Sequence, residues 1–306
     1  MKSIIIIIPY FGKLPTLFPF WLQSALNNPT IDFLFITDAN IQPMQNIKVI
    51  NKTFSLLKEE IQSKFNFEIK LETPYKLCDF KPAYGYIFNE QIKGYDFWGF
   101  GDIDLIYGNI RNFINDTILN QYSVISGWGH LTLYKNTEEC NNFFKRDEAN
   151  FINYKLAFTT SKNLAFDEYL HQGIGDLWKY LYPEKIWDEK MFDDIRIPEK
   201  DFNFISEFHP EYSNGLIFLY KEKQLYRIYN SNGILIQEPT LYAHFQRRKF
   251  ISIKTHNTDE YIIVPNRIIA YENITIKKCN YWGRPQKLQQ KLWKIKNKIH
   301  RIKKIL

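Results

Sequence analysis

The chain has 306 residues, of which 45% are hydrophobic and 17% aromatic, and its formal net charge is +7. This composition excludes a disordered chain, and no apolar run approaches the roughly 18 to 20 residues of a membrane span. Residues 273–306 hold 11 of the 40 basic residues and no acidic residue, so residues 1–272 carry 29 basic against 33 acidic residues. The positive charge therefore belongs to the C-terminal tail, and the body is not predicted to bind nucleic acid.

The first part of the chain alternates between strand and helix patterns. The predicted strands are residues 3–8, 31–36 and 48–50, and the predicted helices are residues 14–27 and 54–65. Pro15 and Pro19 confine the first helix to its later part, and Thr53 is placed to cap the second. This order predicts a parallel, right-handed α/β sheet.

The middle of the chain continues the same pattern. Its predicted helices are residues 83–92, 109–119 and 166–180, the last with a glycine interruption. Its predicted strands are an aromatic one that contains Phe97, Trp98 and Phe100, and residues 122–126 and 131–134. After Gly215 short strands follow at residues 216–220 and 225–229, and Ser231-Asn232-Gly233 is typical of a hairpin turn. We therefore expect a small antiparallel addition after the α/β region.

The cysteines predict a reduced compartment. Cys78, Cys140 and Cys279 are widely separated and form no C-x-x-C pair, which favours a cytoplasmic protein without a zinc site. The isoleucine run at residues 4–8 is too short for the core of a signal peptide and predicts a buried first strand.

Two carboxylates follow the aromatic strand in the middle of the chain. Asp102 and Asp104 flank Ile103, and in an extended backbone they would face the same side. Neighbouring carboxylates repel each other unless a cation or a proton relieves them, and oxygen ligands suit Mg²⁺ or Mn²⁺. The alternative is a turn that uses Asp side chains for its own backbone. Because open α/β sheets bind ligands where their strands end, we favour a metal site.

Other candidates each have a structural alternative. Thr37 and Asp38 end the second strand, where a nucleotide could lie or a simple turn could form. Asp79 and Lys81 precede a predicted helix, so Lys81 could neutralise a phosphate or lie in a capped turn. His130 is as well explained by a structural role as by a substrate contact.

Two later groups have the same ambiguity. Asp167 and His171 would share a helical face beside Glu168, although a helix cap explains Asp167 equally well. His244 and Gln246 lie on one side of a short predicted strand and could complete a metal and diphosphate site, or form an ordinary polar strand face.

The order of these motifs is more specific than any one of them. An apolar first strand, a strand ending in I-T-D, the motif D-F-K-P, an aromatic strand with G-D-I-D and a late A-H-F-Q-R-R resemble the A-type (GT-A) glycosyltransferases with a D-x-D motif. The chain looks most like a bacterial family found with capsular and surface polysaccharide genes. The resemblance implies a GT-A-like, Rossmann-like α/β fold at residues 1–250, with a mostly parallel central sheet flanked by helices. It does not cover the rest of the chain, where we expect an extension at residues 251–283.

The resemblance also implies a function. A sugar would pass from a nucleotide-sugar donor, a UDP-sugar, to a glycan or a lipid-linked oligosaccharide acceptor. Asp102, Asp104 and His244 would hold Mn²⁺ or Mg²⁺ against the donor diphosphate, and Asp167 or Glu168 would take the proton of the acceptor hydroxyl. The remaining donor-binding positions would be Pro9, Tyr10, Thr37, Asp38, Lys81, Gln246 and Arg247.

Two other functions are compatible with the residues. A metal-dependent nucleotidyltransferase also uses paired aspartates, but it releases pyrophosphate. A non-catalytic carbohydrate- or nucleic-acid-binding protein would use the basic tail as its contact surface. Neither a G-x-G-x-x-G nor a G-K-[ST] phosphate loop is present, which disfavours dinucleotide oxidoreductases and P-loop enzymes.

Within the C-terminal tail, residues 284–306 have the pattern of a basic amphipathic helix. Its apolar residues recur at steps of three and four, and they are Leu288, Leu292, Ile295, Ile299, Ile302 and Leu306. Such a helix packs on the body or lies on an anionic membrane surface. Lipid-linked acceptors favour the second alternative, so we expect a cytoplasmic protein that is peripheral at the inner face of the cytoplasmic membrane.

Overall fold

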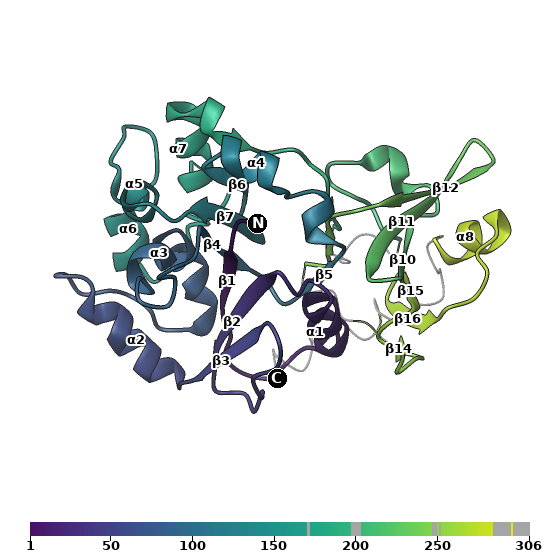
Figure 1. The fold of residues 1–306 in the computed structure, drawn as a ribbon, viewed down its shortest axis with the longest axis horizontal. Helices are drawn as coiled ribbons and strands as arrows, with labels where there is room; N and C mark the ends of the chain where they lie inside the picture. Colours follow the sequence, from purple (N-terminus) through teal and green to yellow (C-terminus); the bar gives the residue numbers. More distant parts are fainter. Residues whose placement is uncertain (170–171, 197–202, 247–249, 251, 284–294, 296–306) are drawn as a thin grey trace. The chain divides into compact units, whose positions relative to one another are not determined.

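The computed structural model describes residues 1–169, 172–196, 203–246, 250, 252–283 and 295. The chain forms two compact units. Unit 1 contains residues 1–15, 25–103 and 111–190, and unit 2 contains residues 16–24, 104–110 and 191–306. Figure 1 shows the path of the chain.

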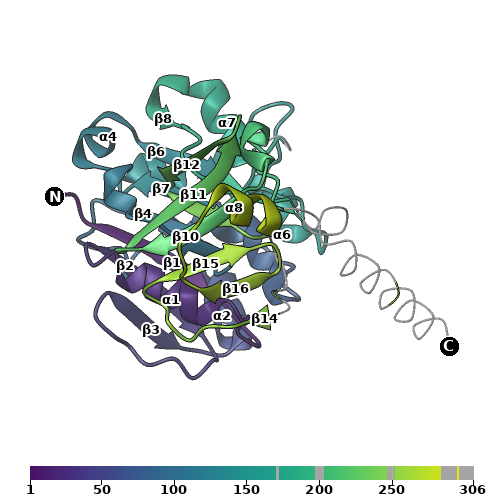
Figure 2. The ribbon, with the colours of Figure 1, turned by 90° about the vertical axis from the view of Figure 1, so that its right-hand side faces the viewer.

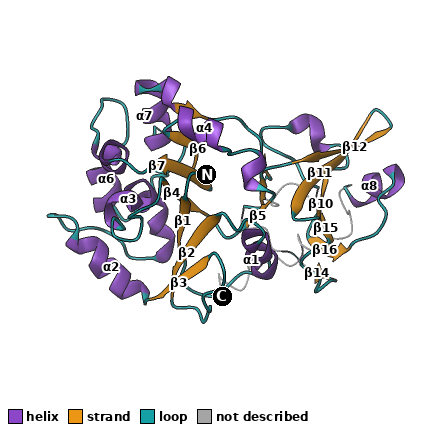
Figure 3. Ribbon diagram, in the orientation of Figure 1, coloured by secondary structure: helices purple, strands orange, loops and turns teal. Residues whose placement is uncertain are grey.

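Unit 1 is built on a seven-stranded sheet with the order β3-β2-β1-β4-β7-β6-β8. Its strands are β1 (Ile4–Pro9), β2 (Ile31–Thr37), β3 (Ile47–Asn51), β4 (Phe97–Gly101), β6 (Val124–Trp128), β7 (Leu131–Lys135) and β8 (Ile186–Trp187). Every pair is parallel except those of β7, which is antiparallel to both of its neighbours (Figure 3). The prediction of a mostly parallel sheet is confirmed.

Helices cover the sheet of unit 1. They are α2 (Phe54–Ser63), α3 (Tyr84–Ile87), α4 (Asp116–Gln121), α5 (Glu138–Asn142), α6 (Tyr154–Thr159) and α7 (Ile174–Leu181), with short 3₁₀ helices η1 (Pro74–Ala83), η2 (Ile110–Asn112), η3 (Phe143–Lys145) and η4 (Pro183–Lys185). Figure 1 shows α2, α3, α5 and α6 on the same side of the sheet. Their apolar residues share one core with Trp98 and Phe100 of β4, which explains why that strand is aromatic.

Unit 2 consists of two further sheets and their covering helices. The six-stranded sheet has the order β12-β11-β10-β15-β16-β14, and the three-stranded sheet has the order β5-β13-β9. The strands are β5 (Leu105–Tyr107), β9 (Asp193–Asp194), β10 (Ile217–Lys221), β11 (Gln224–Ser231), β12 (Ile234–Pro239), β13 (Tyr242–His244), β14 (Ser252–Ile253), β15 (Tyr261–Val264) and β16 (Arg267–Ala270). The expected antiparallel addition is confirmed, and its turn has left-handed φ angles of 51° at Asn232 and 85° at Gly233.

Apolar residues cover both faces of the six-stranded sheet. Helix α8 (Ile276–Trp282) packs Cys279 and Trp282 on one face, and Figure 2 shows it beside the sheet. Leu17 and Phe20, at the start of α1 (Phe18–Leu26), pack on the other face together with residues of the three-stranded sheet. The 3₁₀ helix η5 (Pro210–Ser213) completes the described elements of this unit.

Three predicted helices are shorter than expected. Residues 83–92 form only α3, because the preceding segment is the 3₁₀ helix η1, which contains Pro82. In the segment 109–119, α4 begins only at Asp116, where the side chain of Asn115 accepts the N–H of Thr117. In the segment 166–180, α7 begins only at Ile174, after Gly173.

The described residues contain no helix that is both long and apolar enough to cross a membrane. The predicted basic helix at 284–306 lies outside the described residues, apart from Ile295. Its role and the predicted boundaries at residues 250 and 283 stay predictions.

Candidate functional site

The aspartates of the D-x-D motif lie in a turn between β4 and β5, not in an extended strand. The backbone N–H of Asp102 donates to His130 O in unit 1 (3.1 Å), and the carbonyl of Asp104 accepts the N–H of Phe245 in unit 2 (3.0 Å). The chain passes from unit 1 to unit 2 between Ile103 and Asp104. The extended backbone that was expected here is therefore not formed, because the chain turns to pair β5 with β13, but Ile103 between the two aspartates is buried as expected.

Asp102 is one partner of a buried lysine. Lys81, in η1, places its Nζ 2.8 Å from Asp102 Oδ1 and 3.2 Å from Asp167 Oδ2, and donates to Gly129 O at 2.6 Å. The side chains of Lys81 and Asp167 are only 8% and 4% exposed, whereas that of Asp102 is 34% exposed. Lys81 therefore neutralises two carboxylates inside unit 1. We call Lys81, Asp102, Asp167, Glu168 and Gly129 the lysine–carboxylate cluster.

Burial and charge shift the pKa values of this cluster. Burial raises the pKa of Asp167 to about 7, although the ammonium of Lys81 acts in the opposite direction. Burial lowers the pKa of Lys81, but the nearby carboxylates of Asp102 and Asp167 outweigh it, and the net pKa lies above its usual value. Lys81 is thus held as a cation, and Asp167 can change its charge near neutral pH.

Glu168 differs from Asp167 in its surroundings. Its Oε2 accepts the backbone N–H of Gly129 (3.2 Å), and its side chain is half-buried. A Cβ at position 129 would lie 2.4 Å from Glu168 Oε1 and 2.8 Å from Asp167 Oδ2. Glycine at position 129 therefore allows both carboxylates to approach the backbone.

A second buried ion pair holds the segment that carries these two carboxylates. Asp79 is fully buried, pairs with Lys76 (2.5 Å), and accepts the N–H groups of Leu164 (3.0 Å) and Phe166 (2.9 Å). Lys76 also donates to Lys162 O. The motif C-D-F-K therefore uses Asp79 to fix the backbone before Asp167, and Lys81 to pair with the Asp167 side chain.

The other predicted positions of unit 1 lie at neighbouring strand ends. β1, β2, β3 and β4 are parallel neighbours, so their carboxyl ends meet at one edge. Tyr10 N–H donates to Ile36 O (2.9 Å), and Gly12 N–H donates to Asp38 Oδ1 (3.3 Å). Pro9, Thr37 and Asp102 end or follow the strands of this edge, so the structure brings these positions to one side of the sheet.

The late histidine is held by carboxylates of unit 2. His244 Nδ1 lies 2.8 Å from Asp194 Oδ1, and His244 Nε2 lies 3.5 Å from Asp104 Oδ1. Gln246 Nε2 donates to the same oxygen of Asp194 at 2.6 Å. The group is positioned by the three-stranded sheet, because His244 in β13 pairs with Asp194 in β9 and with Leu105 in β5.

This group holds His244 as an imidazolium. Burial lowers the pKa of His244, but the carboxylates of Asp104 and Asp194 outweigh burial and raise it to about 10. The folded state therefore binds this proton more tightly than the unfolded chain, where the usual value is 6.5. The resulting stability is complete below pH 6.5 and is lost as the pH rises through 10.

A substitution tests whether the stability contributed by His244 falls as the pH rises. We expect His244→Gln to lower the free energy of unfolding most strongly at about pH 6, by up to a few kcal/mol, and the difference from the wild type to narrow towards about pH 10. Urea unfolding of both proteins without added metal measures it. A difference that is constant over this pH range would contradict the assigned pKa of His244.

Sequence reasoning missed Asp194. It follows Phe192-Asp193 without a recognisable motif, and only the pairing of β9 with β13 brings it to His244. A second acidic pair after a buried aromatic residue was the available signal. His171 and Arg247, which were predicted as site residues, lie outside the described residues.

The fold and these groups define a class: a mixed α/β protein with carboxylates and a buried lysine at the carboxyl edge of a mostly parallel sheet. The chain belongs to the family described as "Family of unknown function (DUF6625)", which matches residues 6–272. No curated protein has a significant match to the sequence. The matched residues contain every candidate site residue and end before the basic tail.

Proposed function

We propose that the protein is a metal-dependent glycosyltransferase that uses a nucleotide-sugar donor. The main support is the position of Asp102, which follows β4 at the edge where β1 and β2 also end and is held there by the buried Lys81. Open parallel sheets bind nucleotides at this edge. In this proposal Pro9, Tyr10, Thr37 and Asp38 contact the base and ribose of the donor.

The residues of unit 2 fit a divalent cation. His244 Nδ1 is held by Asp194, while Nε2 faces Asp104, and a histidine whose other nitrogen is fixed by a carboxylate is typical of metal ligands. We propose Asp104 and His244 as ligands, together with Asp102, which lies two residues earlier in the chain. Binding of the cation would displace the proton that His244 carries without metal. When bound, Mn²⁺ or Mg²⁺ would stabilise the negative charge of the departing diphosphate. The residues themselves hold and orient the donor, and Gln246 keeps Asp194 in place.

We propose that Glu168 is the general base that takes the proton from the acceptor hydroxyl. Asp167 is almost fully buried, and its charge is already paired with Lys81, whereas Glu168 is only half-buried. A general base must lie within hydrogen-bonding reach of the proton that it takes, which favours the more accessible group.

The two amide variants separate these roles. We expect Glu168→Gln to reduce transfer by about a hundredfold or more while donor affinity is kept, because the proton acceptor is lost and the shape is not. Asp167→Asn should keep most of the activity. Turnover and donor binding of both variants measure this, and full activity of Glu168→Gln would refute the assignment.

The transferase function itself is tested by product analysis. The protein is incubated with a panel of nucleotide sugars, Mn²⁺ and saccharide acceptors, and the released nucleotide is identified. A nucleoside diphosphate that disappears on chelation of the metal supports the proposal, and pyrophosphate would support a nucleotidyltransferase. Metal-independent glycan binding without any released nucleotide would support a binding protein.

The basic tail leads to a separate proposal, which rests on sequence alone. Residues 273–306 have no acidic residue, and each basic residue near an anionic membrane contributes about 1 kcal/mol to binding. We propose that residues 284–306 attach the protein to anionic lipid, where a lipid-linked acceptor would be available.

Sedimentation with vesicles measures this attachment. We expect the full chain to sediment with vesicles that contain anionic lipid, to be released by high salt, and to lose binding when it is truncated after Gly283. Vesicles of neutral lipid are the control. Equal sedimentation of the full and truncated chains would contradict the proposal.

A further inference from the structure

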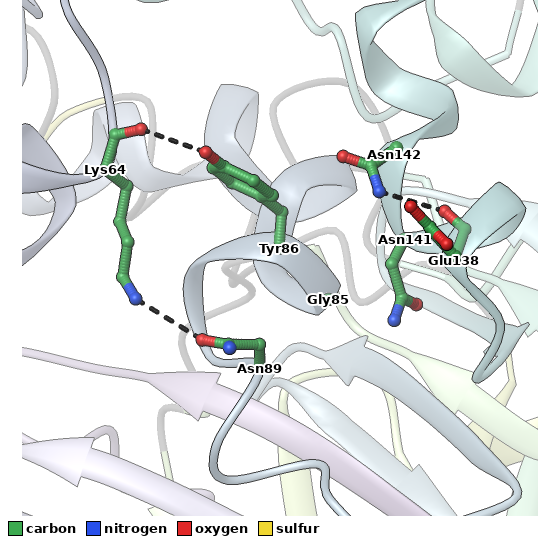
Figure 4. A pocket seen from close by; sticks show the side chains of 7 residues that line it. All are labelled: Lys64, Gly85, Tyr86, Asn89, Glu138, Asn141 and Asn142. Carbon is green, nitrogen blue, oxygen red and sulfur yellow. Dashed lines mark hydrogen bonds between the residues drawn. The ribbon is translucent and has the colours of Figure 1, made fainter.

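Two further groups of polar residues lie outside the lysine–carboxylate cluster. One lines an open pocket of about 480 Å³ in unit 1, and Figure 4 shows its side chains, which include Lys64, Tyr86, Asn89, Glu138, Asn141 and Asn142. Its lining carries both signs of charge, and Lys145 adjoins it through a bond to Asn142 (2.7 Å), so the pocket selects no single class of ligand. The other group is a buried ion pair in unit 2, next in the chain to Asp194, which holds His244.

Arg227 and Asp193 form this ion pair. Arg227 lies in β11, and its Nε is 3.4 Å from Asp193 Oδ2 in β9, with the two side chains only 6% and 0% exposed. The hydroxyl of Thr240 joins them, because it accepts from Arg227 Nη2 (3.3 Å) and donates to Asp193 Oδ2 (3.0 Å). The guanidinium also lies over the ring of Tyr212, 4.9 Å from its centroid. Contacts on several sides therefore fix the geometry of the pair.

The pair anchors the short strand that carries Asp194. β9 consists only of Asp193 and Asp194, which pair with Ala243 and His244 of β13. Successive side chains of a strand point to opposite faces, so Asp193 faces Arg227 while Asp194 faces His244. A shift of β9 at Asp193 would therefore move the carboxylate that lies 2.8 Å from His244 Nδ1.

The energetics of burial favour a positioning role for the pair. Burial raises the pKa of Asp193, and the nearby guanidinium of Arg227 acts in the opposite direction. A buried ion pair often stabilises a fold no more than apolar residues of the same volume, whereas removal of one partner leaves an uncompensated buried charge. The placement of β9 is thus a better explanation of this pair than stability alone.

We propose that Arg227 is a positioning residue that holds the imidazole of His244 through Asp193 and Asp194. In this arrangement His244 Nε2 lies 3.5 Å from Asp104 Oδ1, where it faces the proposed cation. The consequence for cation binding rests on the proposed metal site, but the orientation of the ring does not. The alternative is a pair that only stabilises unit 2, and in that case the His244 ring would keep its place in every folded variant.

Nitrogen-15 NMR of the full chain, labelled at histidine, tests the orientation without metal or substrate. The Nδ1–H of His244, bonded to Asp194, gives a proton resonance that is assigned by its absence in His244→Gln. We expect Arg227→Met to shift this resonance and to speed the exchange of its proton with water, at a temperature far below unfolding. Arg227→Met/Asp193→Asn should restore the resonance, because no unpaired charge then remains in the buried site.

The affinity for Mn²⁺, measured by the electron paramagnetic resonance of the free ion, is the second readout. We expect Arg227→Met to weaken it by about three- to tenfold, because Arg227 acts through one more residue than the direct partner of a metal ligand. The double variant should recover most of this loss. Lys221→Met is the matched control, since Lys221 in β10 pairs with Glu260 at 2.9 Å but is 34% exposed, and both readouts should match the wild type.

Three results would overturn the proposal: an unchanged His244 resonance in folded Arg227→Met, an equal shift in Lys221→Met, or no recovery in the double variant. If Arg227→Met does not fold, Arg227→Lys decides. Lysine keeps the charge but lacks the planar fork that contacts both Asp193 and Thr240, so the resonance should still shift, and an unchanged resonance would overturn the proposal. A shifted resonance in a protein that binds no Mn²⁺ would support the positioning role and contradict the proposed metal site.

Discussion

Asp104→Asn is expected to reduce metal-dependent sugar transfer by at least about a hundredfold. The reason is that it removes a charged ligand of the cation that would neutralise the departing diphosphate. Asp104 lies 3.5 Å from His244 Nε2 in unit 2, and the amide preserves the shape of the side chain. The substitution should therefore leave the fold intact while it weakens metal and donor binding. Asp102→Asn should have a similar effect on transfer.

The measurement is turnover as a function of Mn²⁺ concentration, with thermal unfolding as a check of folding. Asp259→Asn is the matched control, since Asp259 is an exposed carboxylate of the same unit that bonds only Gln23 among the contacts described. Its turnover should equal that of the wild type. Near-normal metal-stimulated turnover of Asp104→Asn would remove the basis of the proposed metal site, whereas loss in the control as well would point to a general effect of charge.

Lys81→Met is expected to lower the free energy of unfolding by about 3–5 kcal/mol, because it leaves a buried carboxylate without its cation. Asp167 is 4% exposed and lies 3.2 Å from the ammonium, and Gly129 O would also lose its donor. The double variant Lys81→Met/Asp167→Asn should recover part of this loss, because the unpaired charge is removed with the lysine.

Urea unfolding at neutral pH measures these values. Lys179→Met is the matched control, because Lys179 forms an ion pair with Asp188 at 2.6 Å but is 56% exposed. An exposed pair contributes only about 0–1 kcal/mol. A loss no larger in Lys81→Met than in Lys179→Met would show that the buried lysine is not needed to neutralise the cluster.

The sequence predicted the strands better than the helices of unit 1. The isoleucine run, the I-D-F-L-F-I segment and the aromatic strand all became buried strands, because continuous apolar residues suit a sheet covered on both faces. The helix predicted at 83–92 failed because Pro82 and the 3₁₀ geometry of η1 dominate that segment. The helix predicted at 166–180 with a glycine interruption is helical only after Gly173, and at its expected start Asp79 accepts the backbone N–H groups of Leu164 and Phe166.

Among the candidate site residues, local patterns predicted some positions, and tertiary packing alone decided others. The positions after β1, β2 and β4 were predictable, since parallel strands bring their carboxyl ends to one edge. The partners of Lys81 could not be predicted in this way. Asp102 and Asp167 are distant from Lys81 in the sequence and meet it only through the packing of η1 against later segments. The pairing of His244 with Asp194 likewise depends on β13 lying beside β9.

The sequence by itself determined the alternating α/β order of the first unit, the hairpin of the second unit and the residue types available for chemistry, because these follow from local patterns of apolar and turn residues. Only the tertiary structure decided that the D-x-D motif is a turn, that Lys81 is a buried counter-ion, and that Asp167 is enclosed while Glu168 is half-buried. These features depend on burial and on contacts between distant segments. Burial and such contacts set the free-energy cost of keeping each group charged, and no local sequence pattern encodes them.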